Sequence, residues 1–288
     1  MDSDCNRLGN GRNLLWFAAV FGFGGCFWRC TPPPPVKSRL PMASAVELLT
    51  QTVPIDISIP LASGKGRTSA WYVPPVRIEP VRANGFVGSV AEGGAVNFRD
   101  IFFNPHGHGT HTECMGHITH EVHSVNAVSI PWLMPCELVT MRPKTLENGD
   151  QIIDLATLLN AAPKPPVALV IRTLPNNIEK MTKAWSNTNP PYITAEAMAH
   201  LVESGVNHLL IDLPSVDREE DDGVLAAHHV FWGIPDAPRP NATITEFVFI
   251  PDQVQDGRYL LNLQTAPFEN DATPSRPLLI PIERYIEH

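Results

Sequence analysis

The stretch TAEAMAHLVESGVNHLLIDL, residues 194–213, places a helix directly before a strand. Thr194 is a suitable N-cap, because its hydroxyl can accept hydrogen bonds from the free backbone N–H groups of the first turn. Gly205 is a typical helix stop. Between them an apolar stripe at helical spacing predicts a helix over 194–204, formed by Met198, Leu201 and Val202. The apolar run Val206–Leu213 that follows predicts a buried strand, so this stretch indicates the α/β class.

Other segments extend the same pattern in both directions along the chain. Apolar runs rich in β-branched residues predict strands at Cys136–Met141 and Val167–Arg172, and a short helix is expected between them at Asp154–Ala162. Further strands are expected at Val53–Leu61, within Gly88–Phe103, at Thr243–Ile250 and at Tyr259–Leu263, with Asp256-Gly257 as the turn between the last two. We therefore predict one α/β domain over 44–288, a mixed β-sheet with flanking helices.

Composition limits the function classes. A chain of 288 residues with 43% hydrophobic content can bury a large core. The net charge is −9 and basic residues are thinly spread, so nucleic-acid binding has no electrostatic support. The five cysteines form an odd set without regular spacing, which argues against a disulfide framework.

Residues 1–43 differ from the rest and are interpreted as an N-terminal extension. Leu14–Trp28 is uncharged and suits the apolar region of a signal peptide, and Cys26 lies where a lipoprotein would be cleaved and anchored. The alternative is that translation begins at Met42 and the preceding segment is spurious or disordered. We expect a cytoplasmic protein in that case, and an exported or membrane-anchored one otherwise.

The run NPHGHGTHTECMGH, residues 104–117, concentrates four of the eleven histidines beside a glutamate. Imidazole and carboxylate groups together are typical ligands of a divalent transition metal. His111, Glu113 and His117 are separated by even numbers, so on an extended segment all three would project to one face. Each histidine alone is more commonly a buried hydrogen-bonding or surface residue, but the group favours metal binding.

His106 and His108 have the opposite parity, and the glycines beside them can redirect the chain before the strand begins. One of the two is therefore expected to reach the same face. Cys114 has the wrong parity for the ligand face and is expected to pack in the interior. His120 and His123 are expected to lie outside the ligand set.

A second candidate group consists of His228, His229 and Glu246. A histidine pair followed by a distant carboxylate is weak evidence alone, and Glu246 could simply be a charge at a strand end. The group gains weight because the first run lacks enough ligands for two metals. Trp71 and Trp232 could line an aromatic pocket, although core packing is the more common role.

The run HGTHTECMGH resembles the signature of the cyclase family that includes bacterial kynurenine formamidases and isatin hydrolases. That signature reads His-x-Gly-Thr-His-x-Asp-x-Pro-x-His, and Gly109-Thr110-His111 and His117 match it directly. Similar segments continue along the chain, at DISIPL (56–61), VIRTLPN (170–176), LIDLPSVD (210–217) and AHH (227–229). The resemblance implies the swivelling β/β/α fold of this family and a homodimer.

The resemblance also implies roles for individual residues. His111 would be a ligand of the first metal, Glu113 would replace the family's aspartate, and His117 would be a second-site ligand or a catalytic histidine. His228 and Glu246 would complete the second site, with His229 close by as a further catalytic candidate.

Four departures indicate a divergent branch, and the first is Glu113 in place of the family's aspartate. The family's first histidine falls on Gly107, so His106 or His108 must take its place, and we prefer His106. Met115 replaces the usual proline, and the segment between His228 and Glu246 is longer than usual.

Together these features predict hydrolysis of a small amide, formamide or lactam by water that one or two divalent ions, Zn or Mn, activate. His117 or His229 would carry the proton to the leaving nitrogen. A metal-dependent lyase or cyclase acting on a hydroxy acid could use the same ligands. A third hypothesis is that the protein is a metal-binding lipoprotein without catalytic activity.

Overall fold

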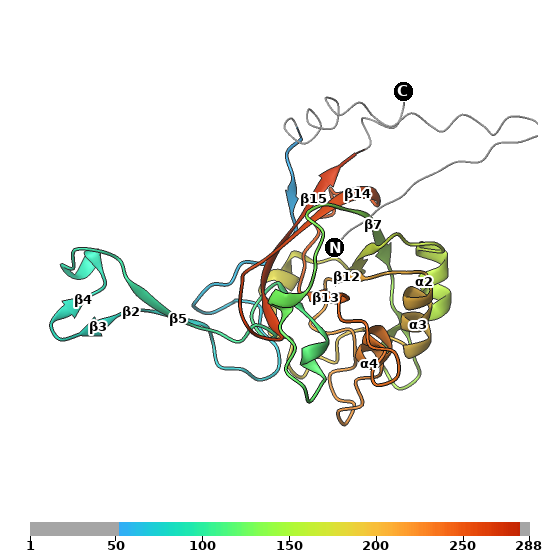
Figure 1. Cartoon of the computed structure of the whole chain (residues 1–288), viewed down its shortest axis with the longest axis horizontal. Helices are drawn as coiled ribbons and strands as arrows, with labels where there is room; N and C mark the ends of the chain where they lie inside the picture. Colours follow the sequence, from blue (N-terminus) through green and yellow to red (C-terminus); the bar gives the residue numbers. More distant parts are fainter. Residues whose placement is uncertain (1–51, 283–288) are drawn as a thin grey trace, which may run out of the picture. The chain divides into compact units, whose positions relative to one another are not determined.

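The computed structural model describes residues 52–282, and a closed seven-stranded β-barrel forms its centre (Figure 1). Around the ring the order is β15-β14-β7-β10-β12-β13-β6, and β6 pairs again with β15. Strands β7, β10, β12 and β13 are parallel, while the other three are antiparallel to their neighbours. Their bounds are β6 His111–Glu113, β7 Met134–Met141, β10 Ala168–Thr173, β12 His208–Ile211, β13 Thr243–Glu246, β14 Gly257–Thr265 and β15 Ala272–Pro281. The predicted α/β class with a mixed sheet is confirmed.

Strands β10 and β12 are buried on both faces, which explains their mostly apolar sequences. Val170 and Leu210 belong to the core cluster that also contains residues of β14 and β15. The alternate residues Leu169 and Ile171 belong to a second cluster, shared with the helices.

Three helices pack against this second cluster: α2 (Leu155–Ala161), α3 (Ala195–Glu203) and α4 (Ala226–Trp232). The Thr194 hydroxyl accepts a hydrogen bond from the Ala197 backbone N–H, and Asp154 caps α2 through the Thr157 N–H. Both predicted helices are therefore confirmed, and so is the predicted cap at Thr194. The short helix α4 was not predicted, and Trp232 at its end is fully buried in the core.

Smaller elements surround the barrel. Strand β1 (Ile55–Asp56) pairs with β15, and a hairpin of β2 (Arg77–Pro80) and β5 (Arg99–Phe102) leads to a smaller hairpin, β3 (Arg82–Ala83) with β4 (Phe86–Val87). A separate sheet contains β8 (Lys144–Thr145), β9 (Gln151–Ile153) and β11 (Tyr192–Ile193). Short 3-10 turns lie at Val90–Glu92, Met115–His117, Val125–Ala127 and Ile178–Met181.

Two expectations about strands need correction. The predicted strand Val53–Leu61 is reduced to β1 and an isolated bridge at Ser58, because Pro54 and Pro60 cannot donate to a ladder. Asp256-Gly257 does not join a hairpin, since β13 pairs with β12 and β6 whereas β14 pairs with β7 and β15.

The predicted N-terminal extension, including Cys26, lies outside the described residues. Within residues 52–282, the helices are all too short or too polar to cross a bilayer.

Candidate metal centre

Strands β6 and β13 place three of the predicted residues on one face. His111 lies opposite Glu246 in the antiparallel register, and Glu113 lies opposite Ile244. Thr112 points to the other face, where its hydroxyl lies 2.7 Å from that of Thr245. Because side chains alternate along a strand, His111, Glu113 and Glu246 share the face that looks toward α4.

His106 and His117 enter from the segments on either side of β6. His106 Nδ1 lies 3.0 Å from Glu113 Oε2, and the His106 and His117 rings stack with centroids 4.2 Å apart. His117 Nε2 lies 3.9 Å from the same Glu113 oxygen. His117 reaches this position through the 3-10 turn, and not on the extended segment that its parity predicted, because the strand ends at Glu113.

The structure brings His106 into the cluster and leaves His108 outside it. His108 Nδ1 instead accepts a hydrogen bond of 2.9 Å from the Asn104 backbone N–H. Gly109 makes the turn between His108 and β6, with φ of +91°. A Cβ added to Gly109 would lie 2.9 Å from the Ile59 carbonyl oxygen, which is too close. Only glycine tolerates both conditions easily.

Asp271, which the sequence analysis did not identify, belongs to the same cluster. Its Oδ2 lies 2.8 Å from His106 Nε2 and 3.5 Å from His117 Nδ1. It directly precedes β15, and the pairing of Ala272 with Glu113 carries it to this place. No spacing pattern near the histidine run pointed to it.

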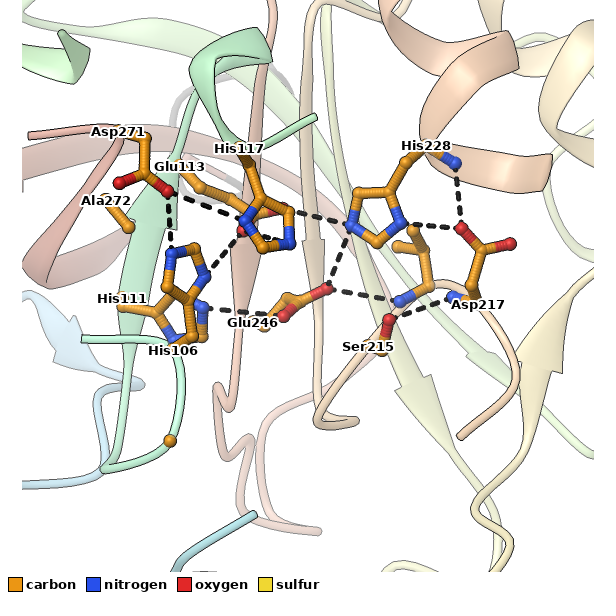
Figure 2. A network of polar contacts seen from close by, with 12 residues as sticks. His106, His111, Glu113, His117, Ser215, Asp217, His228, Glu246, Asp271 and Ala272 are labelled. Carbon is orange, nitrogen blue, oxygen red and sulfur yellow. Dashed lines mark hydrogen bonds and ion pairs between the residues drawn. The ribbon is translucent and has the colours of Figure 1, made fainter. Parts of the chain in front are cut away.

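His228 approaches from the opposite side, on α4 (Figure 2). Its Nδ1 lies 2.6 Å from Asp217 Oδ2, while its Nε2 lies 3.2 Å from Glu113 Oε1 and 3.9 Å from Glu246 Oε1. Asp217 also accepts backbone N–H bonds from Ala227 and His228. It thereby fixes the start of α4 and the orientation of the His228 ring, as carboxylates do behind metal-binding histidines.

His229 follows His228 on the helix and is turned away from the cluster. The contact described for its ring is with the Ile234 carbonyl oxygen, 3.4 Å from Nδ1. A catalytic role for His229 remains a prediction that this geometry does not support. Cys114 is buried, as expected, with its thiol 3.4 Å from the His123 carbonyl oxygen.

The electrostatics of the cluster are those of two buried carboxylates among histidines. Burial alone raises the pKa of Glu113, but the charge of His117 and the hydrogen bonds from His106 and His228 outweigh it and lower the pKa. Burial and the charge of Glu113 raise the pKa of Glu246. For His228, burial acts to lower the pKa, but Asp217, Glu113 and Glu246 raise it to about 10.

One buried nitrogen of the cluster, His111 Nε2, has no hydrogen-bond partner among the described residues, although it lies 3.4 Å from Glu246 Oε2. His111 Nδ1 lies 3.2 Å from the Gly109 carbonyl oxygen, an acceptor only, so Nδ1 carries the proton and Nε2 keeps a lone pair. Buried polar atoms ordinarily find partners, and unpaired ones indicate a missing ion or ligand.

Ligand atoms of these residues converge in three groups, each within 4.8 Å: His106 with His111 and Glu113, His106 with His117 and Asp271, and Glu113 with His117 and His228. Glu246 lies next to them, with Oε2 3.4 Å from His111 Nε2. The nitrogen and carboxylate donors and the unpartnered His111 Nε2 fit a divalent cation.

A cavity of about 640 Å³ opens beside the cluster. His106, His117, His228 and Glu246 form part of its wall, and Trp71 and the segment 218–223 form another part. The volume suits a small organic molecule.

The sequence also matches a known family. The family described as "Putative cyclase" covers residues 55–218, more than half of the chain, and the protein belongs to that family. The match begins at β1 and ends just beyond Asp217.

Two curated relatives are kynurenine formamidases, from Bacillus cytotoxicus and Bacillus mycoides. They are 38% and 37% identical over 93 residues, which is 32% of this chain and 41% of each relative. The chain thus matches about two fifths of the length of these relatives.

Solved structures share the fold at low sequence identity. An isatin hydrolase bound to the product analogue thioisatinate has a TM-score of 0.60 at 13% identity, covering 84% of this chain and 97% of that one. Isatin hydrolase A from Ralstonia solanacearum has a TM-score of 0.59 at 16% identity, covering 86% and 99%. These likenesses establish the cyclase-type architecture predicted from the motifs.

Proposed function

We propose that the protein is a metal-dependent hydrolase that cleaves a small amide, formamide or lactam. The observation that carries the proposal is the convergence of four histidines on two buried carboxylates, with His111 Nε2 left without a hydrogen-bond partner within residues 52–282. Family membership and the names of the curated relatives support the same reaction class.

His106, His111 and Glu113 would hold one ion, and His228 and Glu246 together with Glu113 would hold a second, with His117 left free as the catalytic histidine. Zn and Mn are the ions we expect, since both accept imidazole and carboxylate ligands. A divalent cation held there supplies a Lewis acid that makes water a stronger nucleophile at neutral pH and polarises a carbonyl oxygen.

The chain's own residues provide the remaining functions. The cavity beside the cluster receives the substrate, and its wall presents His117, whose side chain is 30% exposed. His117 Nε2 would deliver a proton to the leaving nitrogen as the C–N bond breaks and the carbonyl carbon gains an oxygen from water. Asp217 keeps the His228 ring in place during this exchange.

The test is metal content and hydrolysis of formanilide by the purified protein and by the double variant His111→Ala/Glu113→Gln. We expect the variant to lose both the ion and the activity. The exposed His120, varied to alanine, is the matched control and should retain both. A double variant that keeps full metal content and full rate would show that the site is assigned wrongly. Incorporation of labelled solvent oxygen into the product separates hydrolysis from a lyase reaction.

A further inference from the structure

One part of the wall of the cavity beside the metal cluster is strongly acidic. Residues 218–223, Arg-Glu-Glu-Asp-Asp-Gly, all line the cavity and carry four carboxylates against one guanidinium. The guanidinium is engaged elsewhere, since Arg218 Nε lies 3.2 Å from Asp150 Oδ2. A ligand in the cavity therefore faces an excess of negative charge on this side.

Two of the four carboxylates hold the loop together. Glu219 accepts hydrogen bonds from the backbone N–H groups of residues 187, 188 and 189, and Asp221 accepts those of Gly223 and Leu225. Glu220 and Asp222 are exposed, and within residues 52–282 no hydrogen bond or ion pair occupies their carboxylates. These two are therefore available to a ligand.

Trp71 supplies an aromatic wall to the same cavity, and its backbone is held in an unfavourable conformation. Trp71 and Tyr72 have φ values of +60° and +56°, which are rare for large side chains and cluster at functional sites. Tyr72 is fixed on both sides: its N–H donates to Ser186 Oγ over 3.0 Å, and its hydroxyl donates to Asn187 Oδ1 over 3.2 Å.

An aromatic face combined with free carboxylates is an arrangement that attracts organic cations. We infer that the substrate carries a positively charged group, such as an ammonium, which binds near Trp71, Glu220 and Asp222 while its amide lies at the histidine cluster. This inference rests on the proposed function for the position of the amide. It disfavours substrates with a carboxylate at that end, because the wall would repel them.

Equilibrium binding to the zinc-loaded protein tests the inference, with benzylammonium and benzoate as probes of similar size. The variant Glu220→Gln/Asp222→Asn removes both charges and keeps the shapes, and asparagine tolerates the φ of +56° at position 222. We expect benzylammonium to bind about tenfold more weakly to the variant. Benzoate should bind equally or more tightly.

The matched control is Glu79→Gln/Asp100→Asn, which removes the same charge from the exposed hairpin of β2 and β5. It should leave both affinities unchanged. In 1 M salt the preference for benzylammonium should largely disappear, because screening is then effective within about 3 Å. The inference is overturned if the cavity variant leaves benzylammonium affinity unchanged or alters both probes equally.

The aromatic wall is tested with two variants that share the same backbone strain. Trp71→Phe should retain most of the benzylammonium affinity, whereas Trp71→Leu should lose it, since only the former keeps an aromatic face. Equal affinities in the two variants would remove Trp71 from the recognition site.

Hydrolysis separates this inference from the proposed function. The substrates are formanilides that carry a 3-aminomethyl, a hydrogen or a 3-carboxylate, and we expect kcat/KM to fall in that order. If none is hydrolysed while benzylammonium binding still depends on residues 220 and 222, amide hydrolysis fails and the cation site stands. Hydrolysis with equal kcat/KM for all three overturns the cation site and leaves the hydrolase standing.

Discussion

Asp212 and Glu113 are both buried carboxylates, and they differ in how their charge is balanced. Asp212 accepts hydrogen bonds from Lys180 Nζ at 2.7 Å and from the N–H and hydroxyl of Thr173. Lys180 itself donates to the Thr173 carbonyl and hydroxyl oxygens as well. This group of residues is complete without any other molecule.

Within residues 52–282, Glu113 has no lysine or arginine beside it. Its neighbours are histidines, which can give up protons, and a second buried carboxylate, Glu246, whose pKa burial and the charge of Glu113 raise. The comparison teaches that a buried carboxylate paired with a lysine ammonium serves the structure. A buried carboxylate surrounded by histidines, whose protons a metal ion can replace, is suited to bind a cation. Four predictions test this distinction, from the largest expected effect to the smallest.

The first prediction concerns the group formed by Asp212, Lys180 and Thr173. Lys180→Met leaves Asp212 buried without a cation and should lower the free energy of unfolding by about 3–5 kcal/mol. Urea denaturation of the metal-free protein measures it. The control is Lys183→Met, whose ammonium lies 4.1 Å from the centre of the Trp185 ring and should cost about 1 kcal/mol. Equal losses in the two variants would contradict the special role of the Asp212 group.

The second prediction concerns the histidine and carboxylate cluster around Glu113. Zinc at about 1,000 times its dissociation constant should raise the free energy of unfolding by about 4 kcal/mol, because it binds only the folded state. A chelator should reverse the gain, and Glu113→Gln should abolish most of it. Lys180→Met should keep the full response to zinc. A zinc response that is equal in wild type and Glu113→Gln would rule out Glu113 as a ligand.

The third concerns the support of His228. Asp217→Asn should weaken zinc affinity by about 10–100-fold, because the carboxylate that orients the imidazole is lost. Asp221→Asn removes a charge from the same loop without touching His228 and should have little effect on affinity. Calorimetric titration of the two variants compares them, and similar affinities would show that Asp217 serves only to cap α4.

The fourth concerns the other face of the strands that carry the ligands. Thr112→Val removes one hydroxyl of a buried pair and should cost about 1 kcal/mol of stability, since the Thr245 hydroxyl loses a partner. The double variant Thr112→Val/Thr245→Val should recover part of that loss, and zinc affinity should not change. Additive losses in thermal denaturation would show that the two hydroxyls are not coupled.

The sequence predicted the regular elements whose local signals are strong. Helix α3 has a cap, an apolar stripe and a glycine stop, and β10 begins with four consecutive apolar residues, Ala168–Ile171. Helix α4 escaped prediction because its N-cap residue, Leu225, has a left-handed conformation and makes no side-chain cap hydrogen bond. Strand β15 escaped because it contains prolines 274, 277 and 281, which normally argue against a strand.

The site residues, too, could be predicted only where a local sequence signal or the family resemblance pointed to them. Local spacing singled out His111 and Glu113 but left His106 and His108 as alternatives, and the preference for His106 came with the family resemblance. His228 and Glu246 were a weak candidate group on their own, and the same resemblance gave them their roles. Asp271 comes to the site only through the pairing of β15 with β6, a contact between distant parts of the chain. Asp217 lay inside a quoted motif, but only the position of α4 reveals that it faces His228.

The pairing of β6 on both sides also has a kinetic consequence. Thr112 and Thr245 are 133 residues apart in the chain, so β6 can join the ring only after a long loop has closed. Such distant pairings form slowly and are expected late in folding. Since β6 carries His111 and Glu113, a refolding chain gains its ligand set in the step that seals the barrel. The time course of zinc uptake during refolding would therefore report when β6 joins the barrel.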